Sequence, residues 1–142
     1  MPLVIWSETR SVGDDRMDEE HIGLISLVNH IYDALETGAD ADSVRRLLAA
    51  LASAAARHFH DEEEMLVRAG YTGLAEHRAE HAGLLQQIET VREEVARLAA
   101  RGLAPDVGNL HRVWLLAWVM DHLEGADADY RSVIAAASPS AA

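Results

Sequence analysis

Apolar residues recur three or four positions apart through most of the chain, a spacing typical of amphipathic helices. The clearest stripe runs from residue 18 to about residue 36, with the apolar positions Leu24, Ile25, Val28, Ile31, Tyr32 and Leu35. Three further stretches predict helices over about 43–69, 74–101 and 106–136. Gly38, Gly70 and Gly102 separate the stretches, and glycine commonly ends helices. The alternating pattern of a strand does not occur.

The ends of these stretches carry residues suited to cap helices. We expect Asp18 to cap the first helix, Asp40 or Asp42 to cap the second, and Pro105 with Asp106 to open the fourth. Residues 1–17 then form an extended N-terminal arm and residues 138–142 a frayed tail, within a single domain over 1–142. Four long helices with short connections predict an all-α, up-down-up-down four-helix bundle.

Length and charge narrow the possible functions. A chain of 142 residues can bury a core without needing a metal to fold. Its 24 acidic and 12 basic residues give a net charge of −12, which disfavours nucleic acid and anionic membranes as partners. We therefore expect a soluble protein that binds neither.

Composition also limits the kinds of site. The chain has no cysteine, which excludes disulfides, iron–sulfur clusters and thiolate zinc sites. The first residues have no basic region before their short apolar run, and the longest apolar run, Val113 to Met120, is too short to span a bilayer. We expect a cytoplasmic protein.

Seven side chains stand where they could meet inside such a bundle: His21, His58, Glu62, His77, His81, His122 and Asp127. His58 with Glu62, and His77 with His81, are four residues apart and so share one helix face. His21 lies on the apolar stripe of its helix, where an imidazole without a partner would be unfavourable.

The last helix supplies the remaining two candidates. His122 follows an apolar run, so we expect it in a buried part of its helix. Asp127 lies five residues later, roughly 140° away on an ideal helix, and a π-bulge near Gly125 is our hypothesis for bringing it inward.

Taken singly, each of these features is ordinary. A lone histidine on an apolar face is more often a core residue, and a His–Glu pair at this spacing is more often a surface pair. We interpret Asp61, Glu63 and Glu64 as a solvated face, and His30, His60 and His111 as histidines outside the site. The conjunction on four helices favours a cage for two metal ions.

Several motifs then identify a family. They are Trp6 with Ser11-Val12-Gly13, Asp18-x-x-His21, His58-Phe59-x-x-Glu62-Glu63 with Met65, Gly70-Tyr71, His77-x-x-x-His81, and Trp118-x-x-x-His122 with Asp127 and Tyr130. In these the chain resembles the hemerythrin and bacteriohemerythrin family over nearly its whole length. The family fold is an up-down bundle, of which myohemerythrin is an established example.

The resemblance implies a cofactor, a ligand and a division of the site. Two non-haem irons would be bound, one by His77, His81 and His122, the other by His21 and His58. Glu62, Asp127 and a solvent-derived oxo or hydroxo group would bridge them. The second iron would keep an open position for dioxygen, bound reversibly for transport or storage, and no catalytic role is expected.

The resemblance also implies an apolar oxygen pocket, formed by Leu24, Phe59, Leu84, Trp118, Val119 and Leu123. The chain departs from the family at Ala54 and Leu84, where aromatic residues are common, and at Ile22, where a basic residue is common. Ala54 and Leu84 could widen the pocket, so we expect a shorter-lived oxygen adduct than an aromatic pocket would give.

Other interpretations remain open. The string from His77 to His81 matches the H-x-x-E-H signature of a zinc peptidase, but that reading leaves five convergent ligands unexplained. No histidine has the Glu-x-x-His spacing of ferritin-like oxidases. A di-iron oxidase or peroxidase, or an oxygen or iron sensor, could use the same cage, and sequence alone does not separate iron from manganese.

Overall fold

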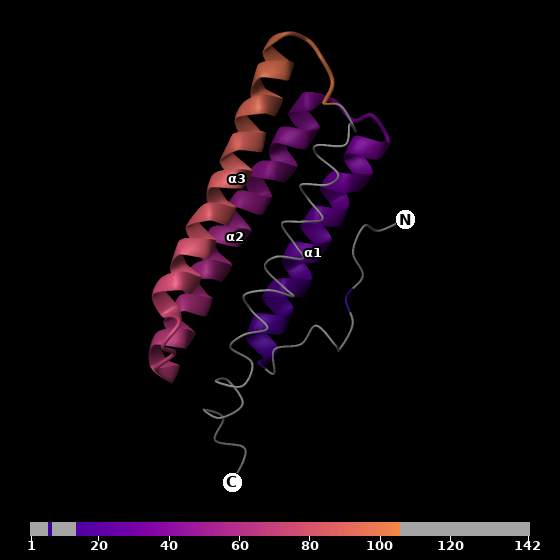
Figure 1. Ribbon diagram of the computed structural model, residues 1–142. Coiled ribbons are helices and arrows are strands. Elements are labelled where there is room, and N and C mark those ends of the chain that lie inside the picture. Colours follow the sequence, from indigo (N-terminus) through magenta and orange to yellow (C-terminus); the bar gives the residue numbers. More distant parts are fainter. Residues whose placement is uncertain (1–5, 7–13, 106–142) are drawn as a thin grey trace.

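Three long helices form the part of the chain that the computed structural model describes, namely Trp6 and residues 14–105. They are α1 (Asp15–Glu36), α2 (Ala41–Ala69) and α3 (Leu74–Ala100). α2 packs against both α1 and α3, and the three lie side by side (Figure 1). This part contains no strand, which confirms the all-α class, and none of its helices is long and apolar enough to cross a membrane. The expected fourth helix lies outside the described residues.

α1 begins one turn earlier than the sequence pattern indicated. The expected cap, Asp18, is wrong, because the side chain of Asp14 accepts a hydrogen bond from the backbone N–H of Met17 at 3.0 Å. Met17 is buried and extends the apolar stripe by one turn, through His21 to Leu24. The helix therefore has to include Met17 for its buried face to be continuous.

The ends of α2 follow the expected chemistry. Of the two candidate caps, Asp40 is used, and its Oδ1 accepts a hydrogen bond from the backbone N–H of Ser43 at 2.7 Å. This bond lowers the pKa of Asp40. At the other end Gly70 adopts the left-handed conformation, with φ 69°, and ends α2 as predicted. Residues 70–73 then lead directly into α3.

Two apolar clusters hold the helices together. The larger contains buried side chains from all three helices: Leu24, Ile25, Val28, Ile31, Leu35, Ala41, Val44, Leu48, Leu51, Ala55, Phe59, Leu84, Ile88, Val91 and Val95. The smaller consists of Met17 and Leu66, with Met65, Tyr71 and Leu74 packed against them at the Gly70 corner. The candidate ligands of α1, α2 and α3 have sequence positions between the members of these clusters.

We expect Asp14→Ala to lower the free energy of unfolding by about 1 kcal/mol, because one backbone N–H loses its acceptor. Asp14→Asn should change it by only a few tenths of a kcal/mol, since asparagine caps helices equally well. Urea unfolding followed by circular dichroism measures both. Equal stability of the alanine variant and the wild type would contradict this cap.

Candidate metal centre

Five polar side chains are buried together where α1, α2 and α3 meet. Their exposed fractions are 0% for His21, 1% for His58, 0% for Glu62, 4% for His77 and 2% for His81. α1 contributes one, α2 two and α3 two. The two i,i+4 pairs are on the inner faces of α2 and α3, as their spacing predicts. The structure thus brings together every predicted ligand among the described residues.

Glu62 lies at the centre of this group. Its Oε1 is 2.5 Å from His77 Nε2 and 2.9 Å from His81 Nε2. Its Oε2 is 3.0 Å from His58 Nε2 and 3.5 Å from His21 Nε2. Each carboxylate oxygen therefore faces a different pair of imidazoles, one pair on α3 and the other shared by α1 and α2.

The surroundings keep Glu62 ionised. Burial alone raises the pKa of a carboxyl group, but contacts with four imidazoles outweigh burial and hold the pKa of Glu62 well below its usual range. A carboxylate of this kind stabilises the fold above the pKa that it has in the unfolded chain, about 4.3. That contribution is lost as the pH falls through the lower pKa of the folded state.

The donor set fits divalent cations. Four protonated imidazoles around one buried carboxylate would be an unfavourable excess of positive charge. Neutral rings that present Nε2 lone pairs would instead oppose the lone pairs of the carboxylate. A cation between nitrogen and oxygen relieves both conflicts, and imidazole with carboxylate is a ligand set suited to zinc, iron or manganese.

The geometry offers two such positions that share Glu62. His21, His58 and Glu62 form one group, and Glu62, His77 and His81 form the other. Within each group the possible ligand atoms lie within 4.8 Å of one another, and all three residues are buried. These are the two halves that the family resemblance implies, apart from His122 and Asp127.

Three members of the predicted oxygen pocket are among the described residues, and one of them contacts this polar centre. The ring of Phe59 stacks on that of His81, with centroids 4.0 Å apart and an interplanar angle of 8°. Leu24 and Leu84 are 3% and 4% exposed. These three members of the predicted oxygen pocket are buried core residues, and whether they contact dioxygen stays a prediction.

Two further carboxylates, which the sequence analysis did not select, contact the imidazoles from outside. The Nδ1 of His58 lies 2.7 Å from Glu20 Oε1, and the Nδ1 of His81 lies 2.8 Å from Glu63 Oε2. The prediction that Glu63 belongs to a solvated face is therefore wrong. Each carboxylate neighbours a predicted ligand in sequence, Glu20 before His21 and Glu63 after Glu62, and that adjacency was the available signal.

Asp61 also departs from the solvated face predicted for it. Its side chain is only 11% exposed, and Arg16 lies 3.0 Å from its Oδ2. A hydrogen bond with Glu20 lowers the pKa of Asp61, whereas burial and the same bond raise the pKa of Glu20. Glu64 does face solvent and pairs with His60 at 3.3 Å.

Several predicted site residues lie outside the described residues: His122, Asp127, Trp118, Val119 and Leu123. Of the histidines that we assigned elsewhere, His30 and His60 are exposed, and His111 is also outside the described residues.

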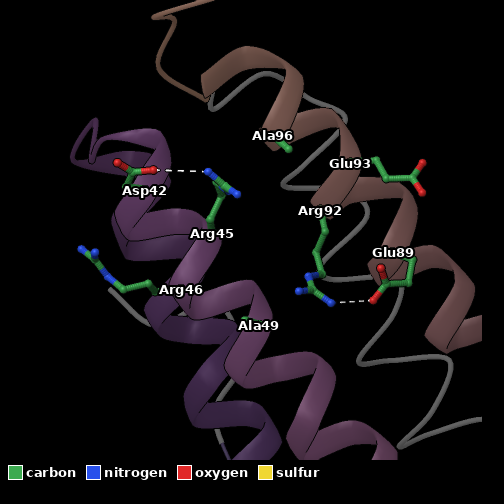
Figure 2. A pocket seen from close by; sticks show the side chains of 8 residues that line it. All are labelled: Asp42, Arg45, Arg46, Ala49, Glu89, Arg92, Glu93 and Ala96. Atoms are coloured by element: carbon green, nitrogen blue, oxygen red, sulfur yellow. Dashed lines mark hydrogen bonds and ion pairs between the residues drawn. The ribbon is translucent and has the colours of Figure 1, made fainter. Parts of the chain in front are cut away.

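A groove of about 440 Å³ lies between α2 and α3, away from this centre (Figure 2). Four of the charged side chains in it pair within their own helices, Arg45 with Asp42 at 3.4 Å and Arg92 with Glu89 at 2.6 Å. Ala49, in its wall, precedes His58 by nine residues, or roughly 13 Å of helix. The groove is a surface feature and contributes no side chain to the metal centre.

Comparison with known proteins agrees with this geometry. The family model described as the hemerythrin HHE cation binding domain matches residues 12–133. Bacteriohemerythrin of Stenotrophomonas maltophilia is 26% identical over 136 residues, which cover 96% of this chain and 84% of that protein. Myohemerythrin of Theromyzon tessulatum is 26% identical over 126 residues, which cover 89% of each chain.

Solved structures show the same fold. The crystal structure of wild-type hemerythrin aligns with a TM-score of 0.78 at 22% identity, over 93% of this chain and 98% of the other. A mutant of hemerythrin aligns with a TM-score of 0.80. With its buried cluster of histidines around a glutamate and a family match over most of its length, this chain belongs to the hemerythrin family.

Proposed function

We propose that this protein binds dioxygen reversibly at two non-haem irons and serves to carry or store oxygen, without a catalytic role. The observation that supports this most strongly is the position of Glu62. One buried carboxylate whose two oxygens face two separate pairs of imidazoles has the form of a bridge between two cations.

The proposed ligand sets follow this division. His77 and His81 would bind one iron together with His122, and His21 and His58 would bind the other. Glu62 and Asp127 would supply the carboxylate ligands. The roles of His122 and Asp127 rest on the sequence motif and the family, because both lie outside the described residues. The site with fewer protein ligands is the proposed position for dioxygen.

The choice of ligands favours holding oxygen over using it. When bound, the irons would supply the electrons that dioxygen takes up on binding and returns on release. Two ferrous ions with two carboxylates and one hydroxide keep a net charge of about +1. The four-carboxylate sites of ferritin-like proteins are more negative and stabilise higher iron oxidation states, which favours oxidase chemistry.

The burial of the predicted pocket residues supports the same proposal. Leu24, Phe59 and Leu84 are nearly completely buried and offer no proton to a bound ligand. An apolar wall also keeps water away from the ligands, and exclusion of water and protons limits irreversible oxidation. The open alternatives, a di-iron oxidase or a sensor, require access for a substrate or a partner in addition to this cage.

We expect metal-free protein to bind two ferrous ions per chain under nitrogen, and its melting temperature to rise. A ligand at 100 times its dissociation constant stabilises the fold by about 2.7 kcal/mol. Glu62→Ala should lose at least one of the two ions, whereas Glu64→Ala, a change on the exposed side of α2, should keep both. Elemental analysis after gel filtration, together with thermal melts, measures this.

We expect the ferrous protein to develop colour when oxygen is admitted, to lose it when oxygen is stripped, and to regain it over repeated cycles. Visible absorption spectroscopy follows the cycles. A single irreversible change to ferric protein, or repeated consumption of an added reductant, would contradict the carrier function and favour an oxidase. Absence of any colour in protein that holds two irons would exclude oxygen binding.

We expect Leu84→Phe to slow the decay of the oxygen adduct, because the phenyl ring is larger than the leucine side chain and would exclude water from the pocket more completely. Leu84 is 4% exposed, so the substitution can lower stability by about 1–3 kcal/mol. Leu84→Met, which keeps the volume, should decay as the wild type does. An unchanged or faster decay in the phenylalanine variant counts against this role for Leu84.

A further inference from the structure

We infer that Glu20 and Glu63 are positioning residues, which fix the orientation and the protonated nitrogen of the metal-binding imidazoles His58 and His81. The inference deepens the proposed function, because it takes His58 and His81 as metal ligands. It assigns a role to two carboxylates that are not part of the proposed cage.

The two contacts have the same form. His58 is 1% exposed, and its Nδ1 lies 2.7 Å from Glu20 Oε1 while its Nε2 faces Glu62. His81 is 2% exposed, and its Nδ1 lies 2.8 Å from Glu63 Oε2 while its Nε2 also faces Glu62. Each ring is therefore held between an outer carboxylate and the central one.

A neutral imidazole carries a single N–H, so its two nitrogens cannot both donate. A carboxylate at Nδ1 accepts that proton and leaves the Nε2 lone pair directed at the centre, which is the form that binds a metal. A carboxylate at this position also makes the ring a more basic ligand. Glu20 and Glu63 thus favour the form of His58 and His81 whose Nε2 can bind a metal.

Each contact crosses from one helix to the next. Glu20 is on α1 and holds a ring of α2, whereas Glu63 is on α2 and holds a ring of α3. The orientation of the His58 and His81 rings therefore depends on how the neighbouring helices are rotated against one another.

Arginines support both carboxylates from the outer side. Arg78 Nε donates to Glu63 Oε1 at 3.1 Å. Arg16 Nε lies 3.6 Å from Glu20 Oε2, and its Nη2 lies 3.0 Å from Asp61. Both arginine side chains are more than half exposed, at 66% and 54%, so the supports are on the surface while the imidazoles are inside.

The two carboxylates serve different halves of the centre. Glu20 holds a ring of the pair His21 and His58, and Glu63 holds a ring of the pair His77 and His81. Loss of one outer carboxylate should therefore lower the affinity for one cation more than the affinity for the other. A carboxylate that acted only through the general negative charge of the protein would weaken both equally.

The test is zinc titration of metal-free Glu20→Gln, Glu63→Gln and the double variant, with Glu19→Gln and Glu64→Gln as matched controls. Glu19 and Glu64 are exposed neighbours that remove the same charge from the same helices. Isothermal calorimetry resolves the two binding steps. We expect each single variant to weaken one step by about 10- to 100-fold, the double variant to weaken both, and the controls to match the wild type.

A second measurement begins with the wild type, which needs no variant to give a result. In zinc-loaded wild type, long-range ¹H–¹⁵N spectra report which nitrogen of each ring holds the metal and which holds a proton. We expect His58 and His81 to bind through Nε2 and to show Nδ1–H protons shifted downfield by a carboxylate acceptor. These two signals should move upfield one at a time in the matching glutamine variants.

The outcomes separate the two proposals. Binding through Nδ1 in the wild type, wild-type affinities in both glutamine variants, or equal weakening in the controls would each overturn the positioning role. Failure of wild-type protein to bind two zinc ions would overturn the two-metal site itself. If a glutamine variant does not fold, the spectra of wild-type protein decide the question.

Discussion

A carboxylate buried in the middle of the bundle is the constraint on which the rest of the structure depends. Glu62 has no exposed surface, and an ionised group in such a place is tolerated only when it is paired and hydrogen-bonded. Four imidazoles from three helices face its two oxygens, and this donor set fits cations held between the rings and the carboxylate. The three helices cannot separate or rotate without leaving a buried charge uncompensated.

This requirement explains the central place of α2. The helix supplies Glu62 and His58 to the centre and packs against both α1 and α3. It also carries Glu63, which contacts His81 of α3, and its His58 contacts Glu20 of α1. Packing of apolar side chains is non-directional and does not by itself define how the helices are rotated against one another. The polar contacts of the centre are directional and add that definition.

Sequence periodicity and spacing were sufficient to predict much of this. The 3.6-residue repeat places the ligand pairs of α2 and α3 on inner faces, and Gly70 ends α2 where predicted. The start of α1 was missed, because Asp14 and Asp18 are equally suitable caps and only the burial of Met17 decides between them. Glu63 was missed for a different reason: a run of acidic residues resembles a solvated face until the partner helix is in place.

The contacts of the two outer carboxylates, Glu20 and Glu63, could not be predicted from the spacing within one helix. Glu20 meets His58 across 38 positions of sequence, and Glu63 meets His81 across 18. Contacts of this kind depend on how neighbouring helices are turned toward one another, and no spacing rule within a single helix contains that information. The family motif includes Glu63 but gives it no role.

The short corner after Gly70 has a consequence for how such chains can vary in length. Only residues 70–73 separate α2 from α3, and the side chain of Tyr71 packs in the small cluster there. One residue inserted into the first turn of α3 would turn the helix beyond it by about 100°, and His77 and His81 would leave the interior. Insertions that natural variation can retain should therefore be scarce at this corner and commoner where a helix end faces solvent.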